Sequence, residues 1–268
     1  MLILGTYSLL SNEKGGWSAH IPAALDAGFN EIDIATYYLI SRSVGKAIIN
    51  RDNILVNTKI WFDEYDSIME KVEQEYNFIG KSLNCVFLHW PKRQSSDYEA
   101  FVKLDIMKKE GWIKKIGLCN VTMEMIQDFR SNTGIKPDIV QNESHIGHID
   151  NKTLNYCKSN NIEYQGWGSM YGMNHPYLMT NTIDERAKAS IVYLILKGIR
   201  PIVFSSNYNH LVQNKKFEEL AKNLSNDERD KFMKLEKFDS QHFAFSGKYP
   251  EKYQCKIIRR KPIAEFKG

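Results

Sequence analysis

Two patterns of apolar residues alternate along the chain. Short apolar runs predict strands centred near residues 3, 32, 56, 87, 117, 140, 164 and 203. Between the runs, apolar residues recur every three or four positions, as Ile68, Val72 and Ile79 do, and this spacing predicts helices. The predicted helices cover residues 17–27, 43–49, 65–83, 100–110, 122–130, 150–160, 184–197, 208–224 and 226–238.

Strands that alternate with helices predict right-handed βαβ units and a parallel sheet. Eight such units in one chain of 268 residues match a closed (β/α)8 TIM barrel. An open doubly wound sheet is the alternative, but the first βα turn lacks G-x-G-x-x-G. No linker or shift in composition divides the chain. We therefore expect one domain over residues 1–268, with an extra C-terminal helix and a tail at 240–268.

Composition and charge are those of an ordinary globular protein. Hydrophobic residues make up 43% and charged residues 25%, and the net charge of +4 is too small and scattered to indicate a nucleic-acid partner. A basic run near the end (Lys256, Arg259, Arg260 and Lys261) is interpreted as a solvated face of the tail.

The cysteines indicate a reducing compartment. Cys85, Cys119, Cys157 and Cys255 form no C-x-x-C pair, which favours free thiols over disulfides or a zinc site. Turn residues directly follow the first apolar residues, so no signal peptide is predicted, and no stretch reaches the ~18 apolar residues of a membrane span. We expect a cytoplasmic protein without a membrane partner.

Candidate chemistry falls at the carboxyl ends of three successive predicted strands. Asp33 and Tyr38 follow the strand near residue 32, Lys59 directly follows the next, and His89 directly follows the third. In a parallel barrel these ends converge on one mouth. Taken singly, Asp33 could cap a turn, the tyrosine could be a wall residue, and Lys59 could reach the surface. Together they predict a site.

This set of residues suits proton donation to a carbonyl. An unperturbed tyrosine has a pKa of about 10, too high for an efficient acid near neutrality. A nearby Lys59 ammonium is expected to lower it, with Asp33 holding the ammonium in place. A neutral His89 can polarise the substrate oxygen by a hydrogen bond.

The segments GFNEIDIATYY, VGKAI, NTKIW, FLHWP, IGLCNV and VQNESH resemble the aldo-keto reductase family, in order and at similar spacing over about residues 1–235. The resemblance implies a (β/α)8 barrel that transfers hydride between a nicotinamide cofactor and a carbonyl or alcohol without a metal. It implies Tyr38 as the general acid, supported by Asp33, Lys59 and His89. Tyr37 is the competing phenol, but Tyr38 has the family's spacing from Asp33.

The resemblance also implies a set of cofactor-binding positions. Cys119 stands where the family usually has serine, and Asn120 and Gln141 would hold the nicotinamide carboxamide beside it. Trp167 occupies the place of the aromatic that stacks on the nicotinamide, and Gly168 and Met170 follow where the family's usual Ser-Pro-Leu is changed. The remaining expected positions are Gly5, Thr6, Tyr7, Asp33, Phe204, Ser205, Ser206, Asn207, His210, Gln213 and Asn214.

The choice between NADP and NAD stays open. Many NADP-using members carry Lys at the position of Phe204 and Arg at that of His210, and both cations are absent here. Each lost charge-assisted hydrogen bond to the 2′-phosphate is worth roughly 1.5–3 kcal/mol. The family favours NADP, whereas these two residues leave NAD equally open.

The substrate side is less defined. The family's walls suggest Tyr7, Trp61, His89, Trp90 and His145 as substrate-binding residues, with Tyr171 and the tail (Phe243, Phe245 and Tyr249) as further candidates. The loops after the fourth and seventh strands are short, which suggests an open mouth and a polar or sugar-like substrate. A monomer is expected from the family.

Two other functions were weighed. One is a nicotinamide-binding regulatory or sensor subunit on the same barrel, since a fold alone does not fix a function. The other is a barrel hydrolase or isomerase, for which paired carboxylates and a metal cluster at the strand ends are missing from the sequence pattern. His145 and His148 form a pair without a third ligand, so no metal is predicted.

Overall fold

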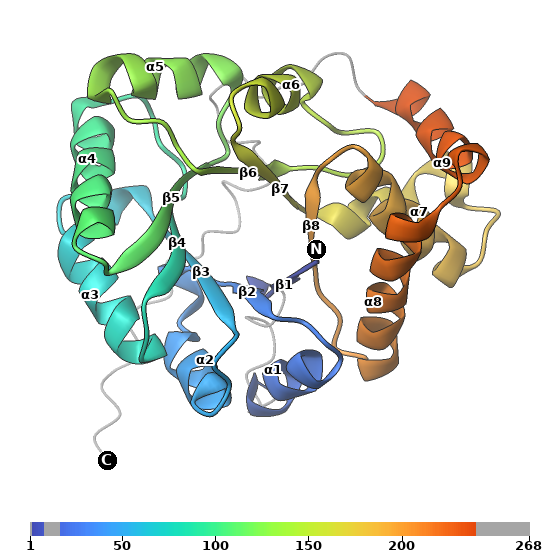
Figure 1. Cartoon of the computed structure of the whole chain (residues 1–268), viewed down its shortest axis with the longest axis horizontal. Coiled ribbons are helices and arrows are strands. Elements are labelled where there is room, and N and C mark those ends of the chain that lie inside the picture. Colours follow the sequence, from blue (N-terminus) through green and yellow to red (C-terminus); the bar gives the residue numbers. More distant parts are fainter. Residues whose placement is uncertain (1, 8–16, 240–268) are drawn as a thin grey trace.

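The computed structural model describes residues 2–7 and 17–239, and in it eight parallel strands close into a barrel surrounded by helices (Figure 1). Each strand pairs with its sequence neighbours, and β1 closes the barrel against β8. The strands are β1 (Ile3–Gly5), β2 (Glu31–Asp33), β3 (Leu55–Ile60), β4 (Leu83–Leu88), β5 (Ile113–Cys119), β6 (Ile139–Glu143), β7 (Glu163–Trp167) and β8 (Arg200–Val203). The predicted barrel is confirmed, and the open sheet is wrong.

The helices occupy the predicted order along the chain. They are α1 (Trp17–Asp26), α2 (Ser41–Ile48), α3 (Ile68–Ile79), α4 (Ser95–Lys109), α5 (Met123–Thr133), α6 (Asn151–Ser159), α7 (Ile183–Leu196), α8 (Tyr208–Asn223) and α9 (Asn226–Met233). The extra C-terminal helix α9 packs beside α7 on the outside of the ring (Figure 1). In the described part of the chain, no helix is long and apolar enough to cross a membrane.

Several helix boundaries differ from the sequence prediction, and two of them have a clear local cause. Helix α4 begins at Ser95 rather than residue 100, because Gln94 and Asp97 form a capping box that precedes the apolar pattern. Helix α3 ends at Ile79, because Gly80 adopts a left-handed conformation with φ +77°. Residues 80–82 therefore form the connection to β4, which begins at Leu83. The predicted caps Thr122 and Ser225 both accept a hydrogen bond from a backbone N–H of their helices.

Apolar side chains fill mainly the layer between the strands and the helices. A smaller apolar cluster, formed by Cys85, Phe87, Cys119 and Ile139, is separate from this layer. Its β4 residues Cys85 and Phe87 pair in register with Lys115 and Gly117 of β5, and Gly117 pairs with Ile139 of β6. Gly117 makes room for it, because a Cβ there would lie 2.3 Å from the Phe87 ring. The barrel interior is thus only partly apolar.

Three of the cysteines, Cys85, Cys119 and Cys157, are buried free thiols, as predicted. Burial raises the pKa of the Cys157 thiol to about 12, and it also raises the pKa of Cys85 and Cys119. These thiols are therefore packing groups rather than nucleophiles. Cys255, the basic run at 256–261 and the whole predicted tail at 240–268 lie outside the described residues.

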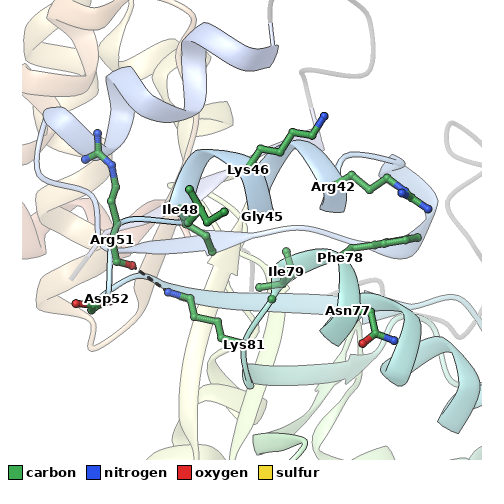
Figure 2. A pocket seen from close by; sticks show the side chains of 12 residues that line it. Arg42, Gly45, Lys46, Ile48, Arg51, Asp52, Asn77, Phe78, Ile79 and Lys81 are labelled. Carbon is green, nitrogen blue, oxygen red and sulfur yellow. Dashed lines mark hydrogen bonds between the residues drawn. The ribbon is translucent and has the colours of Figure 1, made fainter. Parts of the chain in front are cut away.

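Helices α2 and α3 cross closely at Gly45. A Cβ at Gly45 would lie 1.9 Å from the carbonyl oxygen of Phe78, so only glycine fits. Beside this crossing, on the outer wall of the barrel, lies a cavity of about 530 Å³ with Arg42, Lys46 and Lys81 in its lining (Figure 2). Lys46 lies in the last turn of α2, where a cation offsets the negative end of the helix dipole.

A buried carboxylate joins α2, β3 and α3. Glu75 of α3 accepts hydrogen bonds from Ser41 Oγ at 2.9 and 2.8 Å and from Thr58 Oγ1 at 3.0 Å. Burial raises the pKa of Glu75 above its ordinary value, although both hydroxyls act in the opposite direction. Desolvation of the charge therefore outweighs the hydrogen bonds that stabilise it.

Replacement of Gly45 by alanine is expected to lower the free energy of unfolding by about 2–3 kcal/mol, because the methyl group forces α2 away from α3. Urea denaturation of the purified variant measures this. The matched control is Gly134→Ala, where φ is +71° but nothing lies within 4 Å, and which should cost only about 1 kcal/mol. Equal losses in the two variants would contradict the close crossing.

The Glu75→Gln variant should be more stable than the wild type by roughly 1 kcal/mol at pH 7, because it keeps an acceptor for both hydroxyls and removes the buried charge. The pKa of Glu75 is higher in the folded than in the unfolded chain. The wild type therefore regains stability as the pH falls through the folded-state pKa towards that of the unfolded chain. Denaturation midpoints at several pH values should show the difference shrinking, and a difference that grows on acidification would contradict this.

Candidate active site

The four predicted catalytic residues meet at the carboxyl end of the barrel. Asp33 ends β2, Lys59 lies in β3, and His89 follows β4 directly, while Tyr38 lies in a single 3-10 turn, Thr36–Tyr38. All four are buried, with relative exposures of 4% for Asp33, 7% for Tyr38, 2% for Lys59 and 9% for His89. The strand ends thus bring together residues that are up to 56 positions apart (89 − 33).

Lys59 and Asp33 form a buried ion pair. The Lys59 ammonium donates to Asp33 Oδ1 and, at 2.8 Å, to the carbonyl oxygen of Ile34. The other carboxylate oxygen, Oδ2, accepts from Gln141 Nε2 at 2.8 Å. Thr6 Oγ1 donates to the backbone carbonyl of Asp33 at 2.7 Å. Each charge is therefore compensated, which burial of an ion pair requires.

The Tyr38 phenol lies next to this pair. The Lys59 ammonium is 5.2 Å from the centroid of the Tyr38 ring, and the Tyr7 ring meets the Tyr38 ring edge-on at 5.4 Å. Burial raises the pKa of Tyr38 well above its ordinary value, and the Asp33 carboxylate raises it further. The expectation that Lys59 lowers this pKa is wrong for the structure as it stands, because Asp33 offsets the positive charge.

The turn that carries Tyr38 is held by residues that the sequence patterns did not reveal. Thr36 Oγ1 donates to Glu64 Oε2 at 2.5 Å and to the carbonyl of Lys59 at 3.3 Å. Glu64 Oε1 is in turn paired with Lys71 at 2.9 Å. Leu39 ends the turn with φ +56°. A carboxylate three residues after Trp61, at the start of a helical segment, was the available signal for Glu64.

His89 is a neutral imidazole. Burial lowers its pKa well below the ordinary value, and the Lys59 charge adds to the effect. Its Nδ1 is buried without a hydrogen-bond partner in the part of the chain that the structure describes. The ring meets Trp61 edge-on at 4.9 Å. A neutral imidazole in this place can donate to a substrate oxygen without bringing a charge.

Tyr37 and Tyr38 are separated by the turn. Tyr37 is 44% exposed and stacks on Trp61 with ring centroids 5.8 Å apart, whereas it is the Tyr38 ring that lies over the Lys59 ammonium. Trp90 lies beside His89, with ring centroids 6.4 Å apart. Of the two phenols, Tyr38 is therefore the one placed with the ion pair.

The opposite wall comes from β5, β6 and β7. Asn120 donates through Nδ2 to the carbonyl of His89 at 3.0 Å and to Cys119 Sγ at 3.2 Å. Its Oδ1 accepts from Trp167 Nε1 at 2.8 Å, which fixes the half-buried indole. The same wall continues into Gly168, with φ +69°, and the half-buried Met170. These predicted cofactor positions are therefore physically linked to His89.

The segment after β8 leads into α8. Asn207 caps this helix by accepting from the Asn209 N–H at 2.9 Å, and Ser205 Oγ lies 3.4 Å from His210 Nδ1. Ser206, Asn207 and His210 are exposed, whereas Asn214 is buried. Phe204, Ser205 and Gln213 are half-buried.

Gly5 is the last residue of β1 and packs closely against β8. A Cβ added at this position would lie 2.8 Å from the Ile202 side chain.

The histidine pair after β6 surrounds a carboxylate. The rings of His145 and His148 stack with centroids 5.2 Å apart, and their Nε2 atoms lie 3.5 and 3.8 Å from the two oxygens of Glu143. His145 also meets Tyr171 edge-on at 5.8 Å. Within residues 2–7 and 17–239, no group of His, Cys, Asp and Glu side chains is arranged to hold a metal ion.

Several solved structures have the same fold as this protein. Apo Gox0644 superposes with a TM-score of 0.78 at 23% identity, covering 92% of this chain and 91% of its own. Bombyx mori aldo-keto reductase AKR2E4, solved in complex with NADP, superposes with a TM-score of 0.74 at 19% identity, covering 94% and 92%. At these identities, the likeness shows the fold.

Relatives found by sequence similarity give more specific information about the family. YtbE of Bacillus subtilis, an uncharacterized oxidoreductase, is 25% identical over 71% of this chain and 69% of its own length. Methylglyoxal reductase DkgA of Escherichia coli is 29% identical over 56% of this chain, but the match spans only 57% of DkgA. The model of the aldo/keto reductase family matches residues 1–175 of the 268. Because that match covers more than half of the chain, the protein belongs to the aldo/keto reductase family of NAD(P)H-dependent oxidoreductases.

Proposed function

We propose that this protein reduces small carbonyl compounds, with Tyr38 as the general acid and Asp33, Lys59 and His89 as its support. The observation that carries the proposal is the buried Lys59–Asp33 pair beside the Tyr38 ring, with a neutral His89 nearby. A pure binding protein has no need for a buried phenol beside a compensated ammonium. The arrangement is suited to moving one proton.

Burial keeps the Tyr38 phenol protonated at neutral pH but, by raising its pKa, also makes it a weaker acid than a free tyrosine, so it gives up its proton only to a strongly basic oxygen. At neutral pH the phenol keeps its proton until a substrate oxygen, made basic by the incoming hydride, can take it. The Lys59 ammonium is then 5.2 Å from a ring that has become negative. The neutral His89 can hydrogen-bond the same oxygen and fix its direction.

The residues of the opposite wall fit a nicotinamide. The Trp167 indole is held by Asn120 Oδ1 at 2.8 Å and keeps part of its surface open, which suits stacking on a planar ring. We assign Cys119, Asn120 and Gln141 to the carboxamide, and the segment from Phe204 to Asn207 with His210, Gln213 and Asn214 to the phosphates and adenine. When bound, the nicotinamide supplies the hydride.

The substrate that we propose is a small polar carbonyl compound. Among the described residues, Tyr7, Tyr37 and Tyr171 are each about half exposed, which places phenol groups around the mouth of the barrel. Relatives are named for methylglyoxal and glyoxal reduction, which supports a short polar aldehyde. A panel that contrasts methylglyoxal, aldoses and hydrophobic aldehydes tests this class, and turnover of the hydrophobic aldehydes alone would exclude it.

Removal of the Tyr38 hydroxyl by Tyr38→Phe should lower kcat by about 10²–10⁴-fold, because no other group replaces the acid. NADPH affinity, measured by quenching of cofactor fluorescence, should stay within about threefold. The matched control is Tyr37→Phe, which should leave kcat within about threefold because Tyr37 stacks on Trp61 instead. Tight cofactor binding by the wild type without turnover would favour a regulatory subunit.

The cofactor preference should be weak in the wild type and strong after two substitutions. We expect NADPH and NADH to differ by less than about tenfold in affinity, because Phe204 and His210 bring no permanent cation to a 2′-phosphate. Phe204→Lys combined with His210→Arg should raise the preference for NADPH by roughly 10²–10³-fold. Titration of both proteins with both cofactors measures it. An unchanged ratio in the double variant would place the phosphate elsewhere.

A further inference from the structure

A continuous run of hydrogen bonds passes through the barrel interior and ends on Asp33. At its start, Arg200 of β8 donates to Glu163 Oε1 at 2.5 Å. Gln165, also on β7, donates through Nε2 to the same oxygen at 2.9 Å. Gln141 of β6 then donates through Nε2 to Gln165 Oε1 at 3.1 Å and to Asp33 Oδ2 at 2.8 Å.

The carboxylates at the two ends of this run determine which way each amide group between them is oriented. The ionised carboxylates of Glu163 and Asp33 accept hydrogen bonds and donate none. Glu163 therefore draws the NH₂ end of the Gln165 amide towards itself, which leaves Gln165 Oε1 for Gln141. Gln141 must then present its own NH₂ end, and both of its N–H groups are used, one on Gln165 and one on Asp33.

Burial makes this direction hard to change. Gln165 is fully buried and Gln141 is 1% exposed, so bulk water does not compete for their amide groups. Reversal of the Gln165 amide would point its carbonyl at the Glu163 carboxylate, and reversal of Gln141 would point its carbonyl at Asp33. Each reversal leaves an unpaired buried group or sets two acceptors against each other.

We propose that Gln165 is a positioning residue of the active site. It holds the Gln141 amide so that Nε2 donates to Asp33, while Oε1 faces Cys119 Sγ at 3.7 Å and remains the one polar atom that Gln141 can offer to a cofactor. This inference rests on the proposed function, in which Asp33 orients Lys59 beside Tyr38. The Arg200–Glu163 pair at the other end of the barrel fixes the direction of the whole run.

The test compares Gln165→Met with a matched control. Methionine is similar in length but cannot accept from Gln141. The control is Asn84→Leu, another buried amide: Asn84 donates to Asn57 Oδ1 at 2.7 Å, and Asn57 donates to Glu31, which is also paired with Arg200. Asn84 is thus connected to the same arginine but does not lie between it and Asp33.

Four quantities are measured for both variants and the wild type. These are kcat and KM with methylglyoxal, the NADPH affinity, and hydrogen exchange of the Gln141 side-chain amide in protein labelled with ¹⁵N-glutamine. In Gln165→Met, kcat should fall about tenfold while KM and NADPH affinity stay within about threefold. The reason is that a misdirected Gln141 amide disturbs the orientation of Asp33 more than it weakens the binding of substrate or cofactor. The Gln141 amide should lose its protection from exchange.

A conservative variant guards against a folding defect. Gln165→Glu combined with Glu163→Gln keeps a single carboxylate at these two positions and an oxygen that accepts from Gln141, so it should recover at least about threefold of the kcat that methionine loses. The inference is overturned if Gln165→Met lowers kcat no more than Asn84→Leu does, or if the Gln141 amide stays protected in it. If the wild type turns over no carbonyl, the proposed function fails, and amide exchange alone still decides whether Gln165 positions Gln141.

Discussion

The buried Lys59–Asp33 pair is the interaction on which the rest of the site depends. Taking two charges out of water costs several kcal/mol per ion, and their attraction offsets this only if the remaining hydrogen-bonding capacity is satisfied. Here the carbonyl of Ile34 and the amide of Gln141 provide those partners. Their presence explains why β2, β3 and β6 all carry polar residues on the same level of the barrel.

The need for hydrogen-bond partners extends to further polar residues in the barrel interior. The Gln141 amide is directed in turn by the buried Gln165, which donates to the half-buried Glu163–Arg200 pair. Apolar residues inside are reduced to a small cluster around Phe87, and the main apolar core lies between strands and helices. The cost of a polar interior is met by pairing every charge with an opposite one.

The same pair also sets the chemistry of Tyr38. Because Asp33 offsets the Lys59 charge, burial dominates and the phenol holds its proton. Burial lowers the pKa of His89 and so favours the neutral imidazole, and the Lys59 charge adds to this effect. The site is therefore poised to donate a proton to a substrate oxygen that becomes basic, rather than to bind an anion in advance.

The sequence by itself determined the barrel, because eight apolar runs alternating with helical spacing leave few other arrangements. It also indicated Asp33, Lys59 and His89 as neighbours, since carboxyl ends of parallel strands converge. Only the tertiary structure decided the direction in which the pKa of Tyr38 is shifted, because that depends on burial and on the charges beside the phenol. Likewise, Gln165 and Glu64 could not be found from local pattern. Their partners, Gln141 and Thr36, lie 24 and 28 positions away and meet them only because β6 pairs with β7 and β2 pairs with β3.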